Sequence, residues 1–419
     1  MITTEELSDR IAGDGEFRLA ARFWTGGLRL EIGDRTVGFT AVDGAVAPEV
    51  PEPGDGVIIL SASESVWADL TKAVPQPFFH DITAALAVGL TRAGDDLVWW
   101  QYEPAVQRAL ELMGPAEVVT GVATADRGTT PRFDSPTGRY VHLALPDVDG
   151  DGGPVDHRIY FEETGTGIPL LLQHTAGSHG TQWRHLFENP DITSRFRLIA
   201  YDLPFHGKSV PPPTRDWWSV NYRLTGDFLR SVPLALSDAL ELDRPVFMGC
   251  SVGGLLALDL AARHPDRFRA VISLEGALHI GGDPDRLEGF WHPQVSNESK
   301  ARMMQGLTSP TSPVAYRKET IQTYASGWPP AFLGDLFYYM VDYDLRDAAA
   351  DIDTKRIGVH ILSGEYDTSG TVAHGRAAHE AIPGSTFTEM AGVGHFPMSE
   401  NPVGFFPFLL AVLDKIESR

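Results

Sequence analysis

Ser251 stands at the centre of a Gly-x-Ser-x-Gly motif formed by residues 249–253. A short apolar run, 246–248, precedes the motif, and an Ala/Leu-rich stretch with helical spacing follows Gly254. This pattern predicts a sharp turn from a strand into a helix, which lifts the serine oxygen out of the sheet. We expect the adjacent Cys250 to serve in packing, because the motif places the serine at the apex of the turn. Ser251 is therefore a candidate nucleophile.

A serine hydroxyl becomes a good nucleophile only beside a base, and the base needs an acid that orients it. His395 follows a predicted strand at 386–390 in a glycine-rich loop, which makes it the candidate base. Asp367 and Glu275 each end a predicted strand, and both fit the order serine, acid, histidine along the chain. We favour Asp367 and keep Glu275 as the alternative acid. Either carboxylate can instead cap a helix or pair with a basic side chain.

Acyl chemistry also needs N–H donors that face the developing oxyanion. One donor is expected from Val252, at the start of the helix that follows the serine, where the helix dipole favours negative charge. The second is expected from the loop after the strand that ends at Gln173, from Ala176 in the first place and Thr175 in the second. His174 in the same loop is interpreted as a packing residue.

These residues need a scaffold, and the chain from residue 139 to 419 alternates strand and helix signals as a mostly parallel sheet flanked by helices does. Residues 140–145 and 157–162 predict an opening hairpin. The alternation stops at about 281–346, where an insertion rich in aromatic residues predicts a helical cap over the strand ends. Together with Trp217, Trp218 and Tyr222, these aromatics favour an apolar or aromatic substrate, although they can equally form the core of the cap.

The N-terminal stretch, residues 1–127, predicts a smaller α+β domain, joined to the rest by a linker at 128–138 that is rich in turn-forming residues. The predicted strands are 28–32, 37–42 and 57–60, and the predicted helices are 65–74, 78–90 and 104–113. Residues 15–113 resemble a sterol carrier protein-type domain, which implies a module that binds or covers an apolar molecule. A packing or dimerisation domain is the equal alternative, so a homodimer is one expected assembly.

The bulk composition excludes several classes of protein. The 34 basic and 56 acidic residues of the 419-residue chain give a net charge of −22, which repels nucleic acids and anionic membranes. The first residues lack the pattern of a secretion signal and no stretch predicts a membrane span, so we expect a cytosolic protein. The single cysteine excludes an internal disulfide, and no motif predicts a metal ion or a cofactor.

With these motifs in place, residues 135–419 resemble an α/β-hydrolase. Beyond the serine motif, the stretch 201–209 is similar to the family's D-x-x-G-x-G-x-S loop, with Phe205 in place of a glycine. Asp367 and His395 stand at the family's acid and histidine positions, and Glu275 where some members carry their acid. The family's usual His-Gly pair is replaced here by His174 and Thr175.

The resemblance and the motifs together predict a serine hydrolase that cleaves a carboxylic ester or a lactone. Ser251 would form an acyl-enzyme, with His395 as base and Asp367 orienting it. The alternatives are a C–C bond hydrolase that uses the same three residues and a non-catalytic protein that binds a hydrophobic ligand.

Overall fold

The computed structural model describes residues 2–115, 138–147 and 153–418. The chain divides into two compact units, of which the first comprises Met1–Thr120 with Glu288–Thr311 and the second Gly121–Leu287 with Ser312–Arg419. The first unit thus includes a segment of the stretch assigned above to the cap. Of the predicted linker, only Gly138 lies within the described residues.

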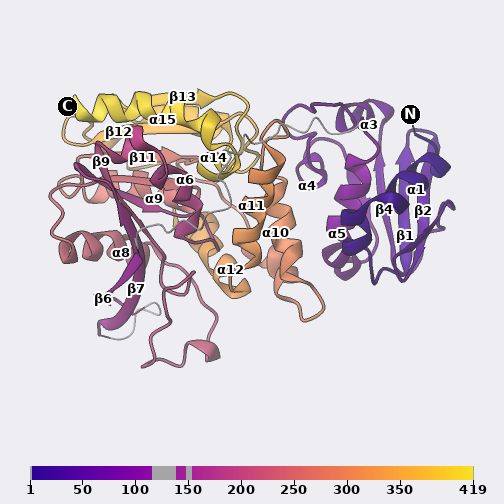
Figure 1. Cartoon of the computed structure of the whole chain (residues 1–419), viewed down its shortest axis with the longest axis horizontal. Helices are drawn as coiled ribbons and strands as arrows, with labels where there is room; N and C mark the ends of the chain where they lie inside the picture. The colour runs from indigo at the N-terminus through magenta and orange to yellow at the C-terminus, as the bar shows by residue number, and fades with distance from the viewer. Residues whose placement is uncertain (1, 116–137, 148–152, 419) are drawn as a thin grey trace, which may run out of the picture. The chain divides into compact units, whose positions relative to one another are not determined.

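The first unit is an α+β unit with a five-stranded sheet in the order β3-β2-β1-β4-β5 (Figure 1). Strand β1 runs parallel to β4, and the other neighbouring strands are antiparallel. The strands are β1 (Gly26–Ile32), β2 (Arg35–Val42), β3 (Ala45–Ala47), β4 (Val57–Ala62) and β5 (Thr91–Ala93). The helices are α1 (Thr4–Gly13), α2 (Gly15–Ala20), α3 (Glu64–Leu70), α4 (Ile82–Ala85), α5 (Asp96–Glu111) and α10 (Asn297–Gln305). Its core is largely aliphatic and includes the buried aromatic side chains of Phe17, Trp24, Phe39 and Trp67.

Two helices of this unit differ from their sequence predictions. The helix predicted over 78–90 is the single turn α4, because Asp81 caps it and the chain then enters β5. The helix predicted from Pro104 begins at Asp96. The Asp95 side chain accepts the N–H groups of Leu97 and Val98, so the helix starts there and the proline lies within it.

The second unit is built on an eight-stranded sheet in the order β13-β12-β11-β10-β8-β9-β7-β6. The strands are β6 (Gly138–Leu145), β7 (Val155–Thr164), β8 (Ile168–Gln173), β9 (Phe196–Tyr201), β10 (Val246–Cys250), β11 (Ala270–Leu274), β12 (Gly358–Gly364) and β13 (Thr386–Met390). Strands β8 to β13 run parallel to one another, whereas β7 is antiparallel to both β9 and β6. The predicted fold class and opening hairpin are therefore confirmed (Figure 1).

Helices connect the parallel strands, as crossovers in such a sheet require. They are η1 (Gly180–Trp183), α6 (Arg184–Phe187), α7 (Pro190–Thr193), η2 (Trp217–Ser219), α8 (Gly226–Ala239), α9 (Val252–Arg263) and α13 (Val372–Ala381). After the last strand, β13, follow α14 (Pro397–Glu400) and α15 (Pro402–Glu417). Between β11 and β12 the chain forms η3 (Pro284–Trp291), α10, α11 (Val314–Ala325), α12 (Pro329–Phe337), the π-helical turn η4 (Tyr338–Asp342) and η5 (Ala349–Asp351).

The central strands of this sheet are buried on both faces. Every residue of β10, β11 and β12 is buried, which explains why their sequences are nearly continuous apolar runs. The parallel arrangement places the carboxyl ends of these strands at one edge, where α/β folds bind their ligands. The four candidate residues Ser251, Glu275, Asp367 and His395 follow β10, β11, β12 and β13 respectively.

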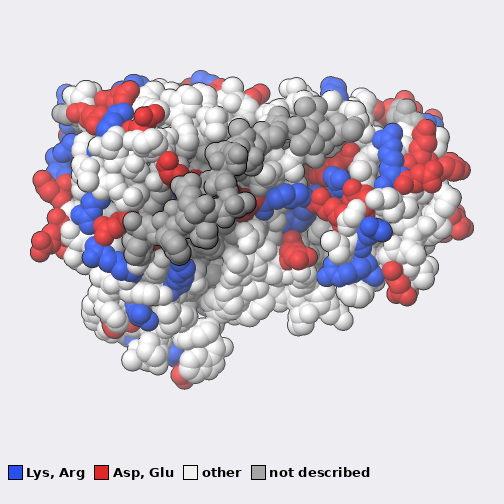
Figure 2. All heavy atoms as spheres, in the orientation of Figure 1, with Lys and Arg blue, Asp and Glu red and all other residues white. Residues whose placement is uncertain are grey.

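In the part of the chain that the structure describes, no helix is long and apolar enough to cross a membrane. On the face drawn in Figure 2, acidic and basic side chains are interspersed among uncharged ones.

Candidate active site

Ser251 occupies a strained turn between β10 and α9. Its backbone has a φ of 58° and a ψ of −115°, and its N–H donates to the carbonyl oxygen of Leu274 at 3.0 Å. Such a conformation costs on the order of 1–3 kcal/mol in a non-glycine residue and persists only where its surroundings enforce it. The flanking glycines are required sterically, because a Cβ on Gly249 would lie 2.3 Å from the carbonyl oxygen of Gly253.

His395 and Asp367 form a buried hydrogen-bonded pair beyond β13 and β12. Nδ1–H of His395 donates to Oδ2 of Asp367 at 2.7 Å, and both side chains are almost fully buried. The other carboxylate oxygen accepts the N–H groups of Ser369 and Gly370 at 2.7 and 3.0 Å. Burial opposes the charge on Asp367, but the facing imidazole and these donors outweigh it and lower the pKa of the carboxyl. The carboxylate is therefore held ionised against the imidazole.

Glu275, the alternative acid, is hydrogen-bonded to Asp367. It is fully buried, with a φ of 55°, and the N–H of Gly364 reaches its two carboxyl oxygens at 3.0 and 2.8 Å. Burial, reinforced by the charge of Asp367, raises the pKa of Glu275 well above its usual value. Glu275 therefore keeps its proton and donates it in a hydrogen bond to Asp367.

Tyr339 links the serine to the acid. This side chain comes from η4, and its hydroxyl is hydrogen-bonded to the Ser251 side chain and to Oγ of Ser369, the latter at 3.0 Å. Since the Ser369 N–H donates to Asp367, a chain of hydrogen bonds joins Ser251 to Asp367 and on to His395. The sequence identified Tyr339 only as one of many cap aromatics.

The buried thiol of Cys250 forms a further hydrogen bond, to the loop that carries His395. Its Sγ–H donates to the carbonyl oxygen of His395 at 3.1 Å, which fixes the histidine loop to the residue before Ser251. Burial raises the pKa of Cys250 well above its usual value, so it stays a neutral thiol, in agreement with a packing role.

The loop after β8 contains an amide that is free to bind an oxyanion. The N–H of Thr175 donates to Oε1 of Gln182 at 3.1 Å, and the N–H of Gly177 donates to Oδ2 of Asp335 at 2.8 Å. Among the described residues, the N–H of Ala176 has no acceptor. The same holds for Val252, the first residue of α9. The two residues that the sequence favours as oxyanion donors thus carry free N–H groups, whereas the N–H of Thr175 is already engaged by Gln182.

Two buried histidines support this loop. His174 donates from Nδ1 to the carbonyl oxygen of Thr175 at 2.8 Å and accepts the N–H of Leu203 at Nε2, at 3.1 Å. Burial lowers the pKa of His174 well below its usual value, so it is neutral and serves to hold the loop. His206 donates from Nδ1 to the carbonyl oxygen of Pro204 at 2.9 Å and from Nε2 to Asp335 at 2.8 Å.

His206 and Asp335 therefore form a buried ion pair. Burial alone would lower the pKa of His206, but the charge of Asp335 and the hydrogen bond to it raise the value on balance. Because Asp335 belongs to α12 and also accepts the N–H of Gly177, this pair ties α12 to the loop that carries Ala176.

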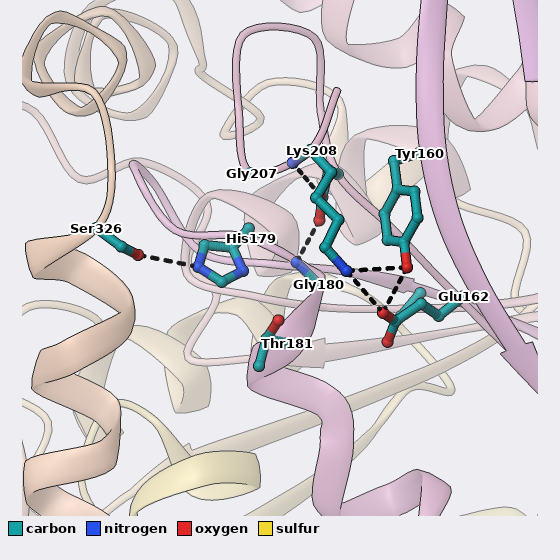
Figure 3. Close-up of a pocket in the computed structure, with 10 residues that line it drawn as sticks. Tyr160, Glu162, His179, Gly180, Thr181, Gly207, Lys208 and Ser326 are labelled. Atoms are coloured by element: carbon teal, nitrogen blue, oxygen red, sulfur yellow. Dashed lines mark hydrogen bonds and ion pairs between the residues drawn. The ribbon is translucent and has the colours of Figure 1, made fainter. Parts of the chain in front are cut away.

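A cavity of about 230 Å³ lies beside the loop that resembles D-x-x-G-x-G-x-S (Figure 3). Asp202 accepts the N–H groups of Gly180 and Lys208, each at 2.7 Å, and so joins this loop to η1. The polar side chains in the cavity pair with one another: Lys208 donates to Tyr160 at 3.0 Å, and His179 is hydrogen-bonded to Ser326 at 3.2 Å. The described residues contain no cluster of side chains that could hold a metal ion.

Comparison with known proteins agrees with this geometry. A family model described as the alpha/beta hydrolase fold matches residues 168–402. A 3-oxoadipate enol-lactonase of Acinetobacter baylyi is 27% identical over 268 residues, which cover 59% of this chain and 88% of that protein. A 2-hydroxymuconate semialdehyde hydrolase of a Pseudomonas species is 31% identical over 152 residues, 35% of this chain and 50% of that protein.

A solved structure resembles the second unit as well. It is a thermophilic esterase from Thermogutta terrifontis, which matches with a TM-score of 0.57 and 21% identity, covering 66% of this chain and 99% of that one. The match of more than half of the chain to the family model, on a sheet of this topology, shows that the chain belongs to the alpha/beta hydrolase fold family.

Proposed function

We propose that the protein hydrolyses a carboxylic ester or a lactone of an apolar or aromatic small molecule through an acyl-enzyme on Ser251. The observation that carries this proposal is the 2.7 Å hydrogen bond between His395 and Asp367, joined through Ser369 and Tyr339 to the side chain of Ser251. Nucleophilic acyl transfer requires an acid that orients a base and a base that takes the proton of the serine hydroxyl directly. The ionised Asp367 orients His395, and Nε2 of His395 comes within hydrogen-bond reach of the strained Ser251 when the substrate is bound.

The reaction follows from the roles of these groups. Ser251 attacks the carbonyl carbon and passes its proton to Nε2 of His395, while Asp367 stabilises the resulting imidazolium. The oxyanion accepts the free N–H groups of Ala176 and Val252, each worth about 10²–10³ in rate. His395 then protonates the leaving alcohol, and water activated by the same imidazole releases the acid and restores Ser251.

The cap supports an apolar or aromatic substrate. Phe332 of α12 lies against Gly177, where an added Cβ would come within 2.6 Å of the Cβ of Phe332, and Tyr339 lies at Ser251. Aromatic side chains therefore stand at both the serine and the loop that carries Ala176, where they bury flat apolar surfaces well.

C–C bond hydrolysis by the same residues is the second candidate, and the similarity to a semialdehyde hydrolase favours it. A panel of p-nitrophenyl esters, an aryl lactone and a vinylogous diketone separates the two, with Ser251→Ala as the control. We expect hydrolysis of the esters or the lactone by the wild type and none by the variant. Turnover of the diketone alone would favour the second candidate, and equal activity of wild type and Ser251→Ala would refute both.

For the first unit, we infer a module of the sterol carrier type that binds or covers an apolar molecule. Its support is the α+β architecture with an apolar core. A fluorescent fatty acid that binds to the Ser251→Ala variant and is displaced by unlabelled lipid would support this inference. A monodisperse dimer that binds no such probe would favour the dimerisation alternative instead.

A further inference from the structure

A second cavity of the hydrolase unit, about 210 Å³ in volume, lies between β7 and the loop that follows β9. Its lining combines aromatic rings with a few polar groups, among them His157, Phe205, Trp217 and Tyr222. A cavity of about 150 Å³ is large enough to hold benzene, so this one accommodates a substituted six-membered ring. None of the proposed catalytic residues lines it.

His157 is the unusual feature of this cavity. Its side chain is 1% exposed, and Nδ1 is buried without a hydrogen-bond partner among the described residues. Burial lowers its pKa to about 4, so the imidazole is neutral near pH 7 and has one N–H donor and one acceptor. An unsatisfied buried polar atom costs about 1–3 kcal/mol, and a hydroxyl group in the cavity would remove that cost, because it can both donate and accept. In the cavity in Figure 3, by contrast, His179 is hydrogen-bonded to Ser326 and Lys208 to Tyr160.

Phe205 is held against the cavity at a conformational cost. Its φ of 72° lies in the left-handed region, which bulky residues rarely adopt. The ring stands 4.9 Å from the ring of Tyr222 and 6.2 Å from that of His157, measured between centroids. Phe205 in one wall has a strained backbone, and His157 in another wall has an unpaired imidazole nitrogen. Such features are typical of a site that is shaped for a ligand.

The charges at the cavity favour a neutral ligand. Arg215 forms an ion pair with Asp147 at 2.5 Å, so its charge is already compensated. Asp216, which also lines the cavity, would repel an anion. An aromatic ring with an uncharged hydroxyl group fits both the apolar walls and the neutral imidazole.

We propose that this cavity is a second binding site, separate from Ser251, for a small neutral aromatic alcohol of the phenol class. The ring lies against Phe205, Trp217 and Tyr222, and the hydroxyl group pairs with Nδ1 of His157.

Calorimetric titration of the Ser251→Ala variant with 4-methylphenol tests the proposal without any turnover, so its outcome is independent of the proposed hydrolysis. We expect one equivalent to bind, and we expect His157→Phe to weaken this binding by about tenfold. Toluene, which lacks the hydroxyl group, should bind weakly and equally to both variants. His179→Phe is the matched control, because His179 lines the other cavity, and should leave the affinity for 4-methylphenol unchanged.

Trp217→Leu provides a second variant that does not disturb β7, and it should weaken the binding of both 4-methylphenol and toluene. The absence of saturable binding, or an affinity for 4-methylphenol that neither His157→Phe nor Trp217→Leu changes relative to the parent Ser251→Ala protein, would overturn the proposal. So would competition between 4-methylphenol and a substrate ester for the Ser251→Ala protein, because it would place the ligand at the serine.

Discussion

Asp367 and Glu275 share one buried hydrogen bond, but only Asp367 reaches the imidazole of His395. The two acids therefore differ in protonation state: Asp367 is ionised and Glu275 is protonated. The sequence favours Asp367 but keeps Glu275 as an alternative, since the two follow the adjacent parallel strands β12 and β11 and lie at the same edge. Which carboxylate contacts the imidazole depends on the direction of each side chain, and no local sequence pattern encodes that direction.

The different roles of the two acids give the first prediction. Asp367→Asn should lower kcat for a p-nitrophenyl ester by about 10³–10⁴-fold, because the amide no longer stabilises the imidazolium. Glu275→Gln should lower it by less than about tenfold, because the glutamine amide can still donate to residue 367. Steady-state kinetics at saturating substrate compares them, and the reverse ranking would make Glu275 the acid.

Tyr339 gives the second prediction at this scale. Burial raises the pKa of its phenol, so the hydroxyl stays protonated and can donate. Tyr339→Phe should reduce kcat by about 2–10-fold with little change in KM, which corresponds to one hydrogen bond of about 0.5–1.5 kcal/mol that orients Ser251. The control is Tyr343→Phe, because the Tyr343 hydroxyl donates to the carbonyl oxygen of Ala277 at 2.9 Å. Equal effects of the two variants would show a merely structural role.

At the scale of elements, the strand β10, the turn at Ser251 and α9 could be predicted because their signals are local. Strands that are buried on both faces need apolar residues along their whole length. The turn needs glycines because a Cβ at these positions would clash with neighbouring atoms. The predicted start of α5 is wrong, because Pro104 marks a helix start in isolation while the cap at Asp95 lies further upstream. The sequence does not single out Tyr339 for a similar reason, since its position depends on the turn η4 and not on its residue type.

The ion pair that ties α12 to the loop of Ala176 gives a pH-dependent prediction. The titratable groups that face His206 are Asp335, Asp202, His174, His179 and Tyr222. The folded pKa of His206 is raised, so the pair contributes its full stability below the unfolded value of about 6.5 and loses it as the pH rises through the folded value.

The difference in free energy of unfolding between wild type and His206→Gln should therefore be largest near pH 6 and shrink at higher pH, as chemical denaturation at several pH values can measure. His142→Gln is the control, because His142 pairs with Asp156 at the surface, where such pairs contribute little. A difference that is constant from pH 6 to 9 would show that His206 is neutral.

At the scale of the whole molecule, the first unit is discontinuous in sequence. Arg302 of α10 is buried in it and donates to Glu16 at 3.1 Å and to Glu111 at 2.9 Å. Phe290 lies 4.5 Å from Trp100, measured between ring centroids. The sequence predicts one boundary, at 128–138. It gives no sign that residues 288–311 belong to the first unit, because local composition does not record which unit a segment packs into.

A buried acid in this unit provides a further prediction. Both carboxyl oxygens of Glu103 are buried without a hydrogen-bond partner among the described residues, and burial raises its pKa to about 8. From about pH 4.5 upward the unfolded chain releases a proton that the folded unit keeps, so the free energy of unfolding falls by up to about 1.4 kcal/mol per pH unit.

Glu103→Gln should remove this slope, so that its melting temperature exceeds that of the wild type at pH 8 but not at pH 4.5. Calorimetric scans at the two pH values measure the difference, with the exposed Glu64→Gln as control. An equal shift at both pH values would contradict the buried, protonated state of Glu103.

The central claim is that Ser251 carries the acyl group. Rapid quenching of the enzyme with a p-nitrophenyl ester, followed by peptide mass spectrometry, tests it most directly. We predict the mass of the acyl group on the peptide that contains Ser251, with longer-lived acylation in Asp367→Asn and none in Ser251→Ala. Ester hydrolysis without an adduct on Ser251, or an adduct that persists in Ser251→Ala, would contradict the account.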